Sequence, residues 1–117
     1  MTYVNGFVLP VPNANREAYR RMAEAAAVVF KEHGALSLVE AWGVDVPDGE
    51  VTSFPMAVKL EEGETVVFSW LVWPSKEVCD AAMPKVMADE RLREWEASMP
   101  FDGKRMIIGG FEVIVEA

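Results

Sequence analysis

The segment MPFDGKRMIIGGFE, residues 99–112, combines features that an ordinary connector does not need. It holds a proline, an Asp-Gly step at 102–103, two adjacent cations, a short apolar run and a Gly-Gly pair at 109–110. The Asp-Gly step favours a reversal of the chain, because it tolerates the backbone angles of tight turns. The Gly-Gly pair lies inside a strand-like run and predicts a β-bulge or a close backbone approach. We therefore expect the fold to be arranged around this segment as it enters a last strand, residues 106–115.

The composition of the chain indicates one globular domain spanning residues 1–117. Half of the residues (51%) are hydrophobic and 26% are charged, which argues against disorder. The formal net charge of −8 repels phosphate groups, and the cations form isolated pairs rather than a basic stripe. We therefore expect no nucleic-acid partner.

The number of cysteines and the lengths of the apolar runs indicate the cellular compartment and whether a metal site can form. Cys79 is the single cysteine, so neither an intramolecular disulfide nor a cysteine-based metal site is possible. The N-terminal residues lack the pattern of a signal peptide, and no apolar run reaches the length of a membrane span. We expect a cytoplasmic protein without a membrane partner and without a metal.

The clearest secondary structure is a helix over residues 16–33. Asn13 and Asn15 are candidate N-caps, and Gly34 stands where helices commonly end. The apolar residues recur on one stripe with helical spacing, which predicts a face buried against the core. The residues of this stripe are Tyr19, Met22, Ala23, Ala26 and Phe30.

A second helical region is predicted from Ser75, its N-cap, to about Ser98. Pro84 lies inside this region and should kink or break the helix, because proline lacks the backbone donor and clashes with the preceding turn. Asp89 is placed to cap a last helical piece.

Five segments have strand-like patterns: residues 3–11, 35–46, 51–60, 65–73 and 106–115, of which 51–60 is the weakest. With two helices, they predict an α+β domain, the ferredoxin-like plait of order βαββαβ. Three consecutive antiparallel strands between the helices would prevent the second right-handed crossover. We therefore expect an extended connection from about Asp45 to Leu60 outside the main sheet.

A plait of this kind covers one face of its sheet with helices and leaves the other face open. Phe7, Leu9, Trp70 and Phe111 are expected on the open face. Exposed apolar faces of this size are normally interfaces. Two plaits can close face to face with two-fold symmetry, so the sequence predicts a homodimer, the dimeric α/β barrel.

Several motifs resemble the YbaA-like family of small bacterial proteins, over nearly the whole chain. The family is a domain of unknown function in the dimeric α/β-barrel superfamily. The resemblance therefore implies the fold and the dimer, while the superfamily's varied enzymes and sensor domains imply no particular chemistry. The motifs are Val39-Glu40-Ala41-Trp42-Gly43, Asp45-Val46-Pro47-Asp48-Gly49, Phe68-Ser69-Trp70, Trp73-Pro74-Ser75-Lys76 and Met99-Pro100-Phe101-Asp102-Gly103-Lys104-Arg105-Met106.

Charged residues supply the candidates for catalysis. His33 is a candidate general base, or alternatively a helix-end residue that interacts with the helix dipole. Lys104 and Arg105, next to Asp102, are candidates to bind a carboxylate or other anion, or alternatively to pair with nearby acids. Glu40 is a candidate base with a raised pKa beside an indole, or alternatively a solvated residue at a sheet edge.

Aromatic residues supply the candidates for ligand binding. Trp42 and Trp70 could line a pocket for a planar organic molecule, and Tyr3 and Asn5 share a face of the first strand that could reach the same cleft. The alternative is that the aromatic residues fill the core or the dimer interface.

Three interpretations of function remain open at this point. The protein could be a cofactor-free enzyme of proton transfer or oxygenation, with Asp102, Arg105, Glu40 and His33 as catalytic candidates. It could instead be a binding or sensing module for a small metabolite, or a purely structural dimer. An enzyme requires a titratable group with a shifted pKa inside a cavity, whereas a binding module requires only the cavity.

Overall fold

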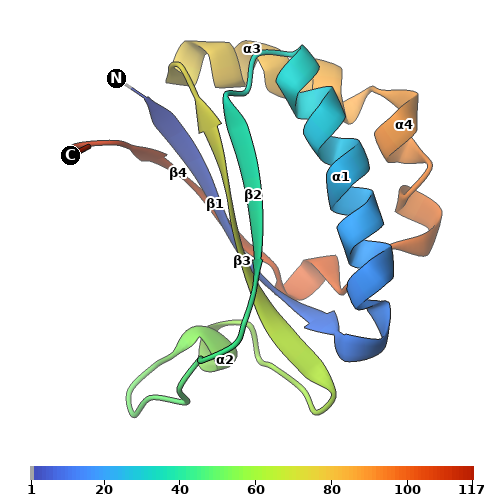
Figure 1. Cartoon of the computed structure of the whole chain (residues 1–117), viewed down its shortest axis with the longest axis vertical. Helices are drawn as coiled ribbons and strands as arrows, with labels where there is room; N and C mark the ends of the chain where they lie inside the picture. Colours follow the sequence, from blue (N-terminus) through green and yellow to red (C-terminus); the bar gives the residue numbers. More distant parts are fainter. Residues whose placement is uncertain (1) are drawn as a thin grey trace.

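The computed structural model describes residues 2–117 and forms a four-stranded antiparallel sheet with helices against one face (Figure 1). The strands are β1 (Tyr3–Pro12), β2 (Ser37–Trp42), β3 (Glu64–Trp73) and β4 (Ile107–Glu112). The α-helices are α1 (Arg16–Glu32), α2 (Phe54–Ala57), α3 (Lys76–Met87) and α4 (Glu90–Arg93), with 3-10 turns η1 (Asn13–Asn15), η2 (Glu96–Ser98) and η3 (Gly103–Arg105).

The sheet has the strand order β2-β3-β1-β4, so the first and third strands lie at its centre. β1 pairs along its whole length with β3, from Tyr3 opposite Trp73 to Pro12 opposite Glu64. On its other side β1 pairs with β4, which is an edge strand. The α+β class predicted from the sequence is confirmed.

Both long helices follow from local signals. α1 ends where predicted, at Gly34, which has a φ of 108° that suits glycine. Asn15 holds the N-cap position of α1, but its side chain donates to the carbonyl oxygen of Pro100 instead of capping the helix. Ser75 caps α3 by accepting from the backbone N–H of Val78.

Pro84 was predicted to kink or break the helical region after β3, and the structure shows that it does not break it. The helix α3 continues through Pro84 and ends three residues later, at Met87, so the proline does not mark the break. Asp89 then caps α4 by accepting from the backbone N–H of Arg91, as predicted. A short helix therefore replaces a continuation of α3.

Residues 43–63 form an arm that leaves the sheet at one end (Figure 1). The predicted extension outside the main sheet is confirmed, but the weak strand at 51–60 is wrong. Pro55 lies in the first turn of α2 and Ser53 caps this helix by accepting from the backbone N–H of Met56. Proline in the first turn costs no hydrogen bond, so the local sequence favours helix over strand.

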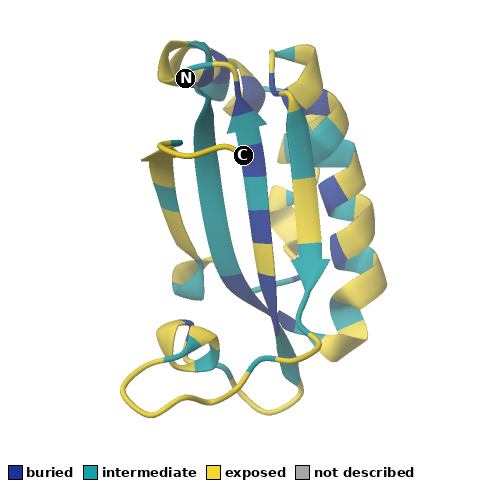
Figure 2. Ribbon diagram, turned by 60° about the vertical axis from the view of Figure 1, so that its left-hand side comes forward, coloured by how far each residue is buried: buried dark blue, intermediate teal, exposed yellow. Residues whose placement is uncertain are grey.

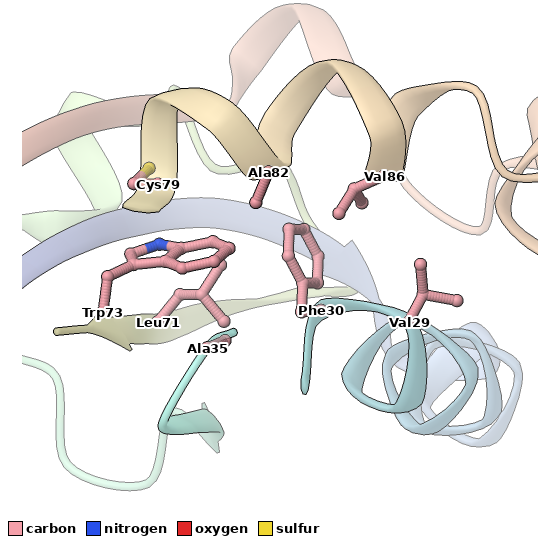
Figure 3. Close-up of a cluster of buried hydrophobic side chains, with 8 residues drawn as sticks. All are labelled: Val29, Phe30, Ala35, Leu71, Trp73, Cys79, Ala82 and Val86. Carbon is pink, nitrogen blue, oxygen red and sulfur yellow. The ribbon is translucent and has the colours of Figure 1, made fainter. Parts of the chain in front are cut away.

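The core lies between the sheet and the helices α1 and α3. Figure 3 shows Trp73 and Leu71 of β3 packed against Ala82 and Val86 of α3, with Phe30 of α1 beside them. Trp73 is fully buried, and its indole N–H donates to Oδ1 of Asn5 at 2.7 Å. The hydrogen bond removes the cost of burying the indole nitrogen.

For the Gly-Gly pair of the opening segment, the predicted bulge is wrong, whereas a close approach to the backbone occurs at Gly110. β4 pairs with β1 in unbroken register through Gly109 and Gly110, so there is no bulge. A Cβ atom at Gly110 would overlap the hydroxyl of Tyr3, which explains a small residue there. Gly103 opens a 3-10 turn that Asp102 caps, and positive φ is not required at this glycine.

Neither α1 nor α3 covers the second face of the sheet, and the short α2 of the arm contacts it, through Phe54 and Phe68 (Figure 2). Residues that face one another across antiparallel strands lie on the same side of the sheet, which places Trp70, Gly6, Gly109 and Phe111 on this face. Phe7 and Leu9 were also expected there, but both pack into the core, because they occupy the alternate positions of β1. Several large apolar residues on the open face are exposed, namely Val39, Phe68, Ile107 and Phe111.

Within residues 2–117, none of the helices combines the length and the apolar character that crossing a membrane would require.

Candidate functional site

A cavity of about 360 Å³ lies between the sheet and the helical layer. Its walls are mostly apolar and come from three parts of the chain. The strands contribute Phe7, Leu9, Leu38, Glu40, Ser69 and Leu71; α1 contributes Tyr19, Met22, Ala23, Ala26 and Phe30; the C-terminal third contributes Met87, Leu92, Trp95, Glu96, Met99, Phe101 and Met106. Its volume is at the lower end of the range of small-molecule sites.

A polar cluster of this cavity, formed by Tyr19, Glu40 and Ser69, lies where α1 faces the edge strand β2, whereas Glu96 belongs to η2. The hydroxyl of Tyr19 donates to Oε1 of Glu40 at 2.6 Å. Ser69, a buried residue of β3, lies directly across the strands from Glu40. Tyr19 also packs edge-to-face against Phe101, which fixes the ring in place.

The surroundings of this pair shift both pKa values. Glu40 is exposed where the cavity opens to solvent, yet the protein atoms around the carboxyl group raise its pKa, and the hydroxyls of Tyr19 and Ser69 partly oppose this shift. Burial and the neighbouring Glu40 raise the pKa of Tyr19, so its hydroxyl stays protonated and remains a donor. The arrangement can accept a proton or bind a donor group of a ligand at Glu40.

One wall of the cavity is made by short elements. Leu92 of α4, Glu96 of η2 and the residues Trp95 and Met99 between and after them all line it. Met99 is 47% exposed, and α4 spans only one turn, from Glu90 to Arg93. Short helices with few buried residues are generally the parts of a fold that open most easily.

Arg105 lies outside the cavity, and its guanidinium is hydrogen-bonded to two acidic side chains and one backbone carbonyl. Its guanidinium makes two hydrogen bonds to the carboxylate of Glu64, at 2.8 and 2.7 Å, and one to Asp102 at 3.0 Å. A further bond reaches the carbonyl oxygen of Lys59, in the arm, at 3.0 Å. Arg105 thus links the arm to Asp102 and to Glu64 at the start of β3. For Arg105 this matches the alternative in which the cation pairs with nearby acids. Lys104 is exposed, and its backbone N–H donates to Asp102.

The other predicted site residues are spread over the molecule. His33 is the C-cap residue of α1 and does not line the cavity. Trp42 lies on the same side of β2 as Glu40 but is covered by the guanidinium of Arg16, 5.0 Å from the ring centre. Trp70 lies on the open face, where its ring packs against Phe68.

Tyr3 and Asn5 have roles within the fold. Both lie on the helix side of β1, as expected, but neither lines the cavity. Asn5 accepts from Trp73, and its Oδ1 atom is also 3.5 Å from the sulfur of Cys79. Cys79 is buried, which raises the pKa of its thiol. Of the nine predicted site residues, Glu40 is therefore the one that lines the cavity.

Sequence reasoning missed Tyr19, Ser69 and Trp95 as site residues. Tyr19 was assigned to the buried stripe of the first helix, which is correct, but its hydroxyl needs a partner there and finds Glu40. The signal for Ser69 was a polar residue at an inward position of a strand that is otherwise apolar. Within residues 2–117, no three His, Cys, Asp or Glu side chains converge as metal ligands would.

The chain belongs to a family of uncharacterised small proteins. Residues 2–103 match the family model described as "Protein of unknown function (DUF1428)". The chain is 62% identical to the uncharacterized protein YbaA of Escherichia coli K12 over 116 residues, which covers 99% of both chains. The YbaA protein of Shigella flexneri matches to the same extent. The resemblance to the YbaA-like family is thereby confirmed.

Solved structures show the same type of fold. The structure of Rv0793 from Mycobacterium tuberculosis matches with a TM-score of 0.55 at 13% identity, covering 100% of this chain and 99% of that one. The de novo designed protein Foldit4 matches with a TM-score of 0.50 at 11% identity, covering 97% and 99%. At these identities the likeness concerns the α+β fold alone.

Replacing Arg105 by Met should lower the urea midpoint of unfolding more than replacing Arg20 by Met. Arg105 is 18% exposed and pairs with Glu64, which is 9% exposed, whereas Arg20 makes exposed pairs along α1. Lys59 has a positive φ of 51°, and its carbonyl would lose its bond to the guanidinium. Equal midpoints for the two variants would contradict the structural role of Arg105.

The difference in stability between the wild type and the Arg105→Met variant should depend on pH. Arg105 holds the pKa values of Glu64 and Asp102 below their ordinary range, so the unfolded chain takes up these protons first as the pH falls. The stabilisation is therefore complete above the ordinary carboxyl pKa and is lost in acid. The difference between the wild type and the Arg105→Met variant should shrink below about pH 4.

Proposed function

We propose that this protein is a cytoplasmic homodimer of the dimeric α/β-barrel type that binds a small organic molecule in the cavity between sheet and helices. The observation that carries the proposal is an open apolar cavity with one polar cluster, Glu40 with Tyr19 and Ser69. Binding sites for small molecules typically combine apolar walls with a few convergent polar groups.

The order of elements supports the finer fold. The main strands and the helices α1 and α3 follow one another as β-α-β-β-α-β, and the sheet order is β2-β3-β1-β4. This arrangement is consistent with a ferredoxin-like plait, in which both helices lie on one face. A plait leaves its second face available for a second copy of the chain.

The open face supports the homodimer. Phe68 is 45% exposed and Phe111 is 60% exposed, and they belong to strands on opposite sides of β1. Phe54 of the arm is also exposed and packs against Phe68, which extends the apolar surface beyond the strands. A second copy related by two-fold symmetry presents the same apolar surface and would cover it.

Proton transfer at Glu40 is a second candidate function. The raised pKa of this carboxyl group and its position in a cavity are the features that an enzymatic base requires. Tyr19, as a fixed donor, would stabilise the carboxylate while it awaits a proton. No cofactor is needed for such a step. This candidate depends on the pKa of Glu40, and it is abandoned if that carboxyl group titrates as an ordinary glutamate.

Filling the cavity should abolish small-molecule binding. The probe is N-phenyl-1-naphthylamine, which is uncharged near neutral pH and fluoresces in apolar surroundings. We expect saturable binding to the wild type and at least about a tenfold loss of affinity in Ala26→Phe, because Ala26 lines the cavity. The matched control is Ala27→Phe, which places the same side chain on the same helix outside the lining residues.

Two outcomes would contradict the binding proposal. One is a wild type that does not bind the probe at micromolar protein. The other is an equal loss of affinity in the two variants, which would place the probe elsewhere, such as on the open face. Circular dichroism melts of both variants establish that they are folded.

Disrupting the open face should convert the dimer into a monomer. Light scattering coupled to size exclusion should give twice the mass of the 13.0 kDa chain for the wild type at micromolar concentration. Phe111→Lys should give the monomer mass, because a charge would be buried in the apolar interface. Val28→Lys, on the exposed side of α1, should remain dimeric. A monomeric wild type would refute the homodimer.

A further inference from the structure

The charges around the cavity restrict which ligands it can take, provided that the cavity binds a small molecule as proposed above. Two carboxylates line it, Glu40 and Glu96. Among the residues that the structure describes, no lysine, arginine or histidine lines it. An anionic ligand would lose its hydration and gain no cationic partner, while both glutamates would repel it.

Glu40 differs from Glu64, another glutamate of the sheet that accepts side-chain hydrogen bonds, in having no cationic partner among the described residues. Glu64 pairs with Arg105 through two hydrogen bonds. Glu40 accepts from Tyr19 through Oε1, and no salt bridge to Glu40 occurs within residues 2–117. A carboxylate can accept about four hydrogen bonds, so Glu40, which lines the cavity, retains capacity to accept from a ligand.

The walls of the cavity suit an apolar body that carries a positive charge. Tyr19 and Phe101 pack edge-to-face at a centroid distance of 5.7 Å, and Phe30 and Trp95 add further aromatic surface. Aromatic faces attract cations as well as burying apolar groups. The net charge of −8 also favours the approach of cations over anions.

We propose that the ligands of this cavity are small hydrophobic amines. The protonated amino group pairs with Glu40 beside Tyr19, and the apolar body lies against the aromatic and methionine side chains. The protonated amine provides Glu40 with a cationic partner, as Arg105 does for Glu64. Lys104 and Arg105, which the sequence suggested as binders of a carboxylate, lie outside the cavity and take no part.

Three probes with one body and different head groups test this inference. They are 4-phenylbutylamine, 4-phenylbutanol and 4-phenylbutyrate, each titrated against the complex of the full chain with N-phenyl-1-naphthylamine near neutral pH. We expect the amine to displace the dye at least about tenfold more tightly than the alcohol, and the carboxylate to displace it least. In Glu40→Gln the amine and the alcohol should become equal.

The control variant is Glu62→Gln, which removes the same charge from an exposed turn and should keep the preference for the amine. Equal displacement by all three probes, or tightest binding of the carboxylate, would overturn the amine inference while leaving the cavity as a binding site. A dye that never binds the wild type would overturn the proposed function itself. The comparison of head groups on the wild type stands even if Glu40→Gln fails to fold.

Discussion

The alternation of side chains along the central strand β3 is the constraint on which the rest of the structure depends. One set of residues, including Leu71 and Trp73, points to the helices and is buried, while the other set, including Phe68, points to the open face. The two faces thereby acquire different roles. The first holds the core and the cavity, and the second is an apolar surface that a partner can cover. Ser69 is the polar exception on the buried side, and it stands opposite Glu40.

Glu40 and Glu64, two glutamates of the sheet, have different roles because their surroundings differ. Arg105 donates hydrogen bonds to Glu64, which lowers the pKa of Glu64. Arg105 also donates to the carbonyl of Lys59 and so connects the arm to the sheet. Glu40 receives a neutral hydroxyl instead, and the apolar cavity raises its pKa. The carboxylate of Glu64 is satisfied within the fold. The carboxylate of Glu40 can accept further hydrogen bonds and lines a cavity, as a binding or proton-accepting group does.

Local signals in the sequence predicted the helices and the arm better than they predicted the site. Gly34 and Asp89 ended and began helices as expected, because capping depends on neighbours in sequence. Of the kink or break predicted at Pro84, the break is wrong, since α3 continues through this residue to Met87. Glu40 was predicted as a site residue, but its contact with Tyr19 was not, because the two residues meet only through packing of a helix against an edge strand. Spacing along the chain carries no record of such a contact.

The most direct test is a titration of the glutamate side-chain carboxyl groups by carbon-13 NMR, with Glu40 and Glu64 assigned. We expect Glu40 to titrate above the ordinary value of 4.5 and Glu64 below it, so that each residue serves as the control for the other. A Glu40 carboxyl that titrates at or below 4.5 would show that the surrounding protein does not disfavour its charged form. The role of Glu40 as a base would then fall, and the account of how the cavity shifts its pKa would be wrong.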